Sequence, residues 1–271
     1  ANPISKVLKM TKVIGEGNYN RELTYKSNIS EIDELIYSIN KLSNELNEQE
    51  NLRKQLTGDI AHELRTPLTS IKGHLDAIVA GIWEPTNDRL NSINEEVTRI
   101  TKLVDELRKL AMFDSGKNNL KKEVVNLKKY IEGIAYNYEG KALEKNIVIK
   151  YQLEDLEVLI DKEKFAQVII NILSNAIKFT DAGGTISVSV NKLNEKVKIG
   201  IKDTGVGIDK KYHDSIFDRF GQVYNGESEG FGGSGLGLTL TKNLITLHGG
   251  EISVISEKGE GSEFIIMLPI Q

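Results

Sequence analysis

Between residues 50 and 111, apolar side chains recur every three or four positions, a spacing that predicts two amphipathic helices. The first helix contains His62, and its apolar stripe consists of Leu52, Leu56, Ile60, Leu64, Leu68, Ile71, Leu75 and Ile78. It should end near Ala80-Gly81, before a turn at Glu84-Pro85-Thr86. The second helix carries a heptad of Leu90, Ile93, Val97, Ile100, Val104, Leu107 and Ala111. Such a hairpin is expected to dimerise into a four-helix bundle, with a bend at Pro67.

Residues 1–50 show a sparser helical pattern. The spacing predicts a short helix after Pro3, a break at Gly15-Glu16-Gly17-Asn18, and a second helix from Ser30 that continues without a breaker into the helix of His62. The apolar stripes of these two helices are too thin to bury themselves. We therefore expect partner helices from a second subunit.

From Lys117 onward the pattern changes to short strands alternating with a few helices. The predicted strands are 146–153, 156–160, 184–191, 196–203, 251–256 and 263–269, and the predicted helices are 162–179 and 236–247. This order predicts an α+β domain with helices packed on one face of a sheet. The segment Phe113-Asp114-Ser115-Gly116, which separates the two patterns, is expected to act as a hinge.

The composition excludes several classes of function. The chain has 271 residues, a net charge of −4 and a pI near 5.8, so nothing indicates nucleic acid as its main partner. It contains no cysteine, which excludes disulfides, thiolate catalysis and cysteine-bound zinc. The most apolar run, residues 165–177, is shorter than the ~20 residues that span a bilayer. Because the pattern is already under way at Ala1, we expect the chain to be part of a longer protein.

His62 is the first candidate for chemistry. It lies two positions from both Ile60 and Leu64, so on a helix it points away from the apolar stripe. Glu63 is adjacent, and Thr66 lies one turn further on. An exposed imidazole beside a carboxylate can act as a nucleophile. Taken alone, the same pattern also fits a solvated surface histidine.

Polar residues on the predicted helix 162–179 form the first of three further clusters. Asn171 and Asn175 are one turn apart, and Lys178 is the next step along the same face. Amide oxygens suit a hard cation such as Mg²⁺, and an ammonium group suits phosphate. A merely hydrated helix face would look the same.

The second and third clusters are rich in glycine. In Asp203-Thr204-Gly205-Val206-Gly207-Ile208, a carboxylate follows a strand and can accept a hydrogen bond from the amino group of adenine, where guanine offers a carbonyl. In residues 232–238, Gly-Gly-Ser-Gly-Leu-Gly-Leu, glycines open a helix whose free N–H groups can bind phosphate. Residues 230–235 also fit the dinucleotide pattern G-x-G-x-x-G, but this match is rejected because a polar loop (221–229) and not a strand precedes them.

These motifs in this order resemble those of the bacterial two-component sensor histidine kinases. The resemblance covers residues from about 50 to 271 and includes the Phe217-Asp218-Arg219-Phe220 cluster; residues 1–50 resemble, less specifically, a HAMP signal-relay module. It implies a multidomain α and α+β chain: HAMP-like helices (1–50), a dimeric four-helix phosphoacceptor bundle (51–115) and an α/β-sandwich ATP-binding domain like those of gyrase and Hsp90 (116–271).

The resemblance also implies roles for individual residues. His62 would be phosphorylated, Glu63 would accept its proton or hydrogen bond, and Thr66 would orient a water molecule that dephosphorylates the partner. Asn171 and Asn175 would face Mg²⁺ and the phosphates, Lys178 the phosphates, and Asp203 the adenine amine. The remaining nucleotide-binding residues would be Gly205, Gly207, Ile208, Phe220, Gly233, Gly235, Leu236 and Gly237, with Phe217 and Phe220 anchoring a lid.

The implied activity is ATP-dependent autophosphorylation of His62 in a homodimer, transfer to an aspartate of a response regulator, and phosphatase activity toward that regulator. A membrane attachment through segments outside this chain would place it at the cytoplasmic face. An ATPase or serine kinase is a rival, although it would lack the His62 hairpin. The segment 221–237 has no basic residue and carries Glu227 and Glu229, which favours a phosphatase-biased or scaffold protein that binds ATP weakly.

Overall fold

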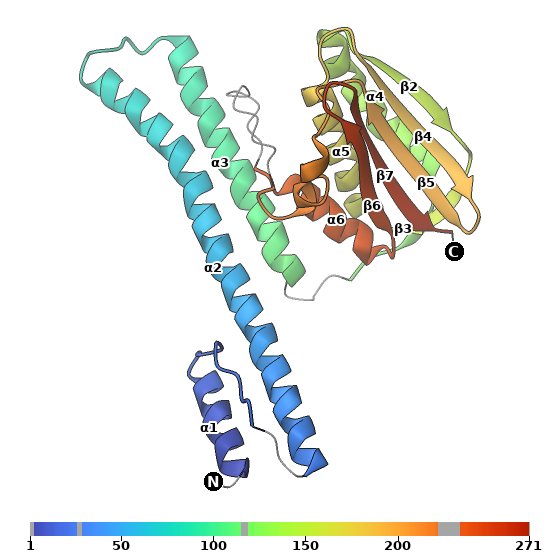
Figure 1. Cartoon of the computed structure of the whole chain (residues 1–271). Coiled ribbons are helices and arrows are strands. Elements are labelled where there is room, and N and C mark those ends of the chain that lie inside the picture. Colours follow the sequence, from blue (N-terminus) through green and yellow to red (C-terminus); the bar gives the residue numbers. More distant parts are fainter. Residues whose placement is uncertain (1–2, 26–28, 115–118, 222–233, 271) are drawn as a thin grey trace. The chain divides into compact units, whose positions relative to one another are not determined.

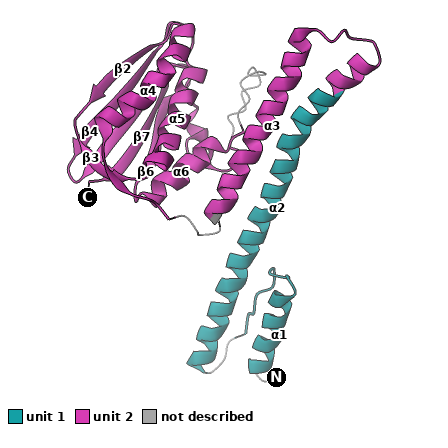
Figure 2. Ribbon diagram, turned by 180° about the vertical axis from the view of Figure 1, so that it is seen from behind, with its two compact units in different colours: residues 1–72 teal, residues 73–271 magenta. Residues whose placement is uncertain are grey.

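A computed structural model of the chain describes residues 3–25, 29–114, 119–221 and 234–270 (Figure 1). The chain divides into two compact units, residues 1–72 and 73–271, and the boundary falls inside a long helix (Figure 2). None of the helices in the described ranges is both long and apolar enough to cross a membrane.

The first unit contains α1 (Pro3–Gly15) and most of α2 (Ser30–Val79). Its small core joins Val7 and Met10 of α1 to Ile36 and Ile39 of α2. The segment between the helices is held against α2 by side-chain hydrogen bonds, since the Asn40 amide pairs with both main-chain groups of Leu23 (3.0 Å each) and Ser43 donates to Tyr19 O (2.9 Å). Large apolar side chains stay exposed on both helices: Ile4, Leu8, Leu35, Tyr37 and Leu42.

The long helix α2 carries His62 and runs through Pro67 without interruption. It ends at Val79, where the sequence predicted an end, and Gly81 adopts a left-handed conformation (φ 70°) in the turn that follows. The return helix α3 spans Asn87–Asp114. The bend at Pro67 stays a prediction.

The second unit also contains an α/β domain (Figure 1). Its five-stranded sheet has the order β2 (Val148–Leu153), β4 (Thr185–Leu193), β5 (Lys196–Asp203), β7 (Gly261–Pro269) and β6 (Glu251–Glu257). Only β2 and β4 pair in parallel; the other pairs are antiparallel. A separate two-stranded sheet pairs β1 (Glu123–Asn126) with β3 (Glu157–Ile160).

Three helices cover one face of the five-stranded sheet: α4 (Leu127–Glu144), α5 (Lys162–Phe179) and α6 (Gly237–Leu247) (Figure 1). Two short 3₁₀ helices, Lys210–Tyr212 and Ser215–Phe217, precede α6. The core lies between helices and sheet, where Phe165, Ile169 and Leu173 of α5 are fully buried with Ile186 and Ile199 of the sheet. The prediction of helices on one face of a sheet is confirmed.

The predicted strands and helices of this domain are confirmed with small shifts at their ends, but β1 and α4 were missed. The apolar face of α4 is sparse, and two of its buried members, Ala135 and Ala142, are small. Asn126 caps the start of this helix, since its side chain accepts a hydrogen bond from Lys129 N (3.0 Å). A face built partly from alanine gives a weak periodic signal, which explains the omission.

Candidate nucleotide-binding site

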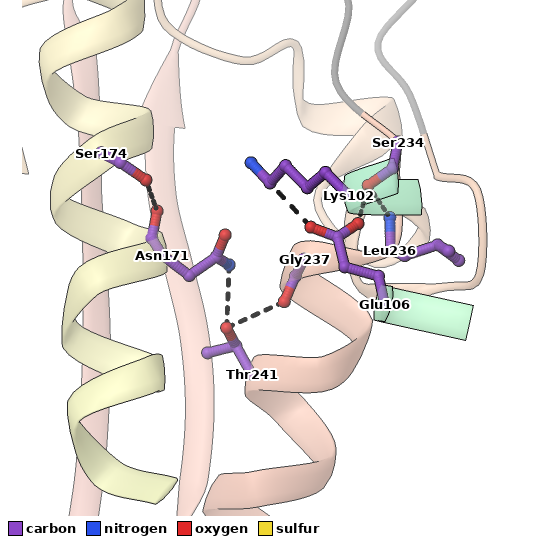
Figure 3. A network of polar contacts seen from close by, with 8 residues as sticks. All are labelled: Lys102, Glu106, Asn171, Ser174, Ser234, Leu236, Gly237 and Thr241. Carbon is purple, nitrogen blue, oxygen red and sulfur yellow. Dashed lines mark hydrogen bonds and ion pairs between the residues drawn. The ribbon is translucent and has the colours of Figure 1, made fainter. Parts of the chain in front are cut away.

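Helix α5 supplies the first part of the site. Its apolar face is buried in the core, which leaves Asn171, Asn175 and Lys178 half-buried on the opposite side. The Asn171 amide nitrogen donates to Thr241 Oγ1 (2.9 Å), and Thr241 in turn donates to Gly237 O (2.9 Å) (Figure 3). These bonds connect the polar face of α5 to the first turn of α6.

Asp203, at the end of β5, is buried with only 5% of its surface exposed. Its Oδ1 atom accepts hydrogen bonds from Gly205 N (2.9 Å) and Ser262 N (3.2 Å), and no hydrogen bond to Oδ2 occurs within the ranges that the structure covers. Burial raises the pKa of this carboxyl above its ordinary value, while the two N–H donors oppose the rise. One oxygen is therefore fixed, and the other can accept a further hydrogen bond.

The loop after Asp203 requires residues without side chains. A Cβ atom on Gly205 would lie 2.2 Å from the carbonyl oxygen of Phe179, and one on Gly207 would lie 1.9 Å from that of Glu257. Ser256 Oγ also fixes the loop by accepting from Ile208 N (2.7 Å). The glycines of the DTGVGI motif are thus required by close backbone contacts with α5 and β6.

The glycine cluster opens α6. Gly235 has φ 67° and packs against Phe220, itself left-handed (φ 57°), while Leu236 is fully buried and Gly237 begins the helix. Gly233 and most of the 221–237 segment, on which the lid prediction falls, lie outside the described residues. The fold brings Gly237 next to Asn171 (Figure 3).

Helix α3 also contacts the start of α6. The Ser234 hydroxyl donates a hydrogen bond to Glu106 on α3 and accepts one from Leu236 N (3.3 Å). Glu106 Oε1 lies 3.9 Å from Lys102 Nζ, one turn away on α3 (Figure 3). Sequence reasoning missed the Ser234–Glu106 contact, because the two residues are 128 positions apart.

Lys178 lies at the end of α5. Burial lowers its pKa, and the positive charges of Lys102 and Arg99 on α3 lower it further. A second lysine, Lys145, supports the same helix by donating to the carbonyl oxygens of Ile177 and Lys178 (3.0 Å each) and of Thr180 (3.3 Å). Lys145 belongs to none of the motifs, and no local pattern around it signals this role.

The predicted phosphoacceptor His62 and its two predicted helpers, Glu63 and Thr66, belong to the first unit, on α2. His62 and Thr66 are exposed and Glu63 is half-buried. The Thr66 hydroxyl donates to His62 O at 3.4 Å, which places Thr66 one helical turn after His62 as predicted. An exposed imidazole with a neighbouring carboxylate remains compatible with nucleophilic chemistry.

The metal prediction rests on Asn171 and Asn175 alone. In the described part of the chain, no group of three or more His, Cys, Asp or Glu side chains could hold a metal ion. Of the remaining histidines, His248 is buried and hydrogen-bonded within the fold, and His74 stacks edge-on against Trp83 (centroids 5.3 Å apart). Their surroundings agree with structural roles.

Two family matches coincide with these regions. Residues 52–116 match the His Kinase A (phospho-acceptor) domain, and residues 160–271 match the family described as histidine kinase-, DNA gyrase B- and HSP90-like ATPase. The chain thus belongs to the sensor histidine kinases, combining a phosphoacceptor domain with an ATP-binding domain.

Individual proteins to which the chain is similar also carry the name of histidine kinase. The chain is 35% identical to the sensor histidine kinase WalK of Bacillus subtilis over 83% of its length, and 28% identical to the signal transduction histidine-protein kinase BaeS of Escherichia coli over 99%. It spans only 38% of the WalK chain and 58% of the BaeS chain. Among solved structures, it is similar to Acinetobacter baumannii histidine kinase AdeS, with a TM-score of 0.66, 26% identity, and coverage of 78% of this chain and 98% of AdeS.

Proposed function

We propose that this chain uses ATP to phosphorylate His62 and then transfers the phosphoryl group to an aspartate of a separate response regulator. The observation that carries the proposal is that one chain holds an exposed histidine within a phosphoacceptor match and an ATPase-type domain with a buried, half-satisfied aspartate. The names of the relatives, which are signal-transducing histidine kinases, support it.

In the first step, a ring nitrogen of His62 forms a bond to the γ-phosphorus of ATP, while the bond from that phosphorus to the bridging oxygen breaks and ADP leaves. Glu63 accepts the hydrogen bond or proton of the imidazole, which keeps a lone pair on the attacking nitrogen. In the second step, an aspartate of the regulator takes the phosphoryl group and His62 is restored. Thr66, one turn from His62, orients a water molecule when the protein instead dephosphorylates the regulator.

The nucleotide is held by residues of α5, β5 and α6. Asp203 accepts a hydrogen bond from the adenine amine through Oδ2, and Gly205, Gly207 and Ile208 form the loop against which the base packs. Lys178 and the α6 N-terminus, with Gly233, Gly235, Leu236 and Gly237, face the phosphates. Phe217 and Phe220 anchor the segment that precedes α6.

The amide oxygens of Asn171 and Asn175 suit Mg²⁺. In Asn171 the amide nitrogen is bonded to Thr241, which fixes the orientation of the group. Its Oδ1 atom is turned toward Gly237, 2.5 Å from where a Cβ atom there would lie. A bound Mg²⁺ would neutralise charge that develops on the phosphates during transfer.

Three proposals concern the wider protein. The chain is a homodimer, which the exposed apolar residues on α2 and α3 support, among them Leu68, Leu75, Leu90, Val97 and Val104. Residues 1–50 form a HAMP-like relay, supported by two helices joined by a segment that packs along α2.

Segments beyond this chain attach it to the membrane at its cytoplasmic face. The boundaries 1–50, 51–115 and 116–271 are part of the same proposal.

The test is incubation of the chain with γ-labelled ATP and Mg²⁺. The native chain should gain label that is acid-labile and alkali-stable, and His62→Gln should gain none. His74→Gln, on the same helix, is the matched control and should be labelled normally. Addition of a receiver domain should then move the label to an aspartate of that domain.

Label that persists in His62→Gln would show that another residue is the acceptor. A folded, dimeric native chain that binds nucleotide but gains no label would favour the phosphatase-biased or scaffold function. The absence of basic residues in 221–237 is the one feature that supports this second candidate.

A further inference from the structure

The carboxylate of Glu106 contacts the start of α6, the helix end at which the nucleotide phosphates are proposed to bind. It lies on α3, which packs against α6. Its carboxylate accepts the hydrogen bond of Ser234, whose hydroxyl in turn accepts from Leu236 N (Figure 3). The Glu106 side chain is only 12% exposed, compared with 77% for neighbouring Lys102, so the carboxylate is held inside the contact.

The start of α6 has no anionic partner of its own. Its first turn contains no acidic residue, and its N-cap Leu236 makes no side-chain capping bond. Free N–H groups and the helix dipole favour a negative charge at this end. Glu106 supplies one from a distant part of the chain, at the element where the phosphates of a nucleotide are proposed to bind.

The carboxylate of Glu106 is paired with a basic side chain near the proposed phosphate site. Lys102 lies 3.9 Å from Glu106. Lys178 of α5 is close enough to Lys102 and Arg99 for their charges to affect it. Glu106 is thus paired with Lys102, whose charge also reaches Lys178, in a site whose adjoining segment 221–237 contributes no basic residue.

We propose that Glu106 is an intramolecular competitor of the nucleotide phosphates, held by Ser234 at the start of α6 and displaced when nucleotide binds. Displacement frees α3 from α6 and leaves Lys102 and Arg99 to face the phosphates. This inference rests on the proposed nucleotide site. It adds a contact through which the phosphoacceptor hairpin opposes nucleotide binding.

The physical reason for competition is charge. A phosphate group and the Glu106 carboxylate cannot share the same donors, since like charges at such short range repel strongly. Nucleotide must therefore break the Glu106–Ser234 hydrogen bond before its phosphates can bind. Because hydrogen bonds to a charged group are stronger than neutral ones, the apparent affinity falls by about tenfold or more.

The test is calorimetric titration of the full chain with AMP-PNP and Mg²⁺. Glu106→Gln should bind about tenfold more tightly than the native chain, because the neutral amide does not repel phosphate. Glu106→Asp, which keeps the charge but shortens the side chain, should also bind more tightly, since it no longer reaches Ser234. Asp105→Asn, an exposed neighbour on α3, is the matched control and should leave the affinity unchanged.

Adenosine provides a second probe, because it lacks phosphate. Its affinity, measured by chemical-shift titration, should be the same in the native chain and Glu106→Gln. A gain for AMP-PNP but not for adenosine assigns the effect to the phosphate end of the site. Equal gains for both ligands would overturn the inference, because Glu106 would then act on the whole domain.

Other outcomes separate this inference from the proposed function. If the native chain binds AMP-PNP and Glu106→Gln binds it equally or more weakly, the inference fails and the proposed function stands. If neither the native chain nor any variant binds nucleotide, both fail. If only the Glu106 variants bind AMP-PNP, the inference is supported, because Glu106 would then prevent nucleotide binding in the native chain.

Discussion

The ammonium group of Lys145 lies 3.0 Å from the main-chain carbonyl oxygen of Lys178, at the end of α5. The same ammonium donates to the carbonyls of Ile177 and Thr180, so one side chain satisfies three of the carbonyl groups that a helix end leaves unpaired. The neighbouring carbonyl of Phe179 accepts from Val206 N (3.2 Å). Lys145 therefore helps to hold the helix that carries Asn171 and Lys178 against the loop after Asp203.

Replacing Lys145 by methionine should weaken both the domain and its nucleotide binding. Methionine keeps most of the apolar stem but leaves the carbonyls without a donor, which should lower the free energy of unfolding by about 1–3 kcal/mol. Because α5 carries Lys178, the affinity for AMP-PNP should fall several-fold. Urea unfolding and calorimetric titration measure the two effects.

Lys141→Met is the control for Lys145→Met. Lys141 is exposed on the last turn of α4, and no hydrogen bond from its ammonium group occurs in the described structure. Its replacement should change neither stability nor affinity measurably. Lys145→Arg should restore part of both. An unchanged affinity in a destabilised Lys145→Met would limit Lys145 to a structural role.

Nucleotide binding should weaken on acidification at a higher pH than an ordinary aspartate would allow. Burial raises the pKa of Asp203 above 3.8. As the pH falls through this raised value, the carboxylate gains a proton and becomes a poor acceptor for the adenine amine, so affinity is lost. The pH dependence of folding stability without ligand has the opposite sign. The folded chain holds the proton of Asp203 more tightly than the unfolded chain, so this group favours folding most at low pH, and its contribution is lost as the pH rises.

Asp203→Asn separates this effect from other titrations. The variant should bind AMP-PNP at least tenfold more weakly at pH 7, because its amide cannot replace both carboxylate oxygens as acceptors. Its remaining affinity should not show the acid transition of the native chain. An acid transition of the same midpoint in Asp203→Asn would assign the titration to another group or to the base itself.

Two glycines where β6 connects to β7, Gly259 in the turn and Gly261 at the start of β7, should respond differently to alanine. Gly261 and Gly259 have nearly the same φ (89° and 88°), but a Cβ on Gly261 would lie 2.1 Å from Asp203 O, whereas one on Gly259 would meet nothing within 4 Å. Gly259→Ala should cost only the ~1–2 kcal/mol of left-handed backbone strain.

Gly261→Ala should cost more than Gly259→Ala, because it also pushes the backbone at Asp203. It should reduce nucleotide affinity as well, and Gly259→Ala should not. Thermal unfolding and AMP-PNP titration of the two variants test the comparison. Equal costs for the two would mean that the backbone at Asp203 can move away freely.

The stability of the ATP-binding domain should fall below pH 6.5. His248 is buried, and burial lowers its pKa. Its Nδ1–H donates to Leu244 O (2.7 Å) and its Nε2 accepts from Asp161 N (3.0 Å), an arrangement that requires the neutral ring. The stabilisation is thus complete above the unfolded value of about 6.5, and it is lost as the pH falls through the lower folded value.

His248→Gln should be less stable than the native chain at pH 7.5, by about 1–3 kcal/mol. The difference should shrink as the pH falls from 7.5 toward 5. Urea unfolding of the native chain and His248→Gln across this pH range measures the difference. A constant difference for His248→Gln would contradict the predicted titration.

Local periodicity in the sequence determined most of the secondary structure. The stripes around His62 and Leu90 specified α2 and α3, and the alternation in residues 184–203 specified β4 and β5, because burial of one face imposes the period of the element. The motifs on 171–178, 203–208 and 232–238 also indicated the family, because their residue types and order are local properties of the chain. The sequence did not predict helix α4, because its buried residues Ala135 and Ala142 give only a weak apolar pattern.

Contacts between distant residues could be decided only by the tertiary structure. The pairing of Lys145 with the end of α5, of Ser262 N with Asp203, and of Glu106 with Ser234 joins residues separated by more than 30, 50 and 120 positions. No local pattern encodes such pairs, since each depends on how packed elements bring their ends together. Sequence periodicity therefore determined which faces are buried, and packing decided which polar groups meet at the site.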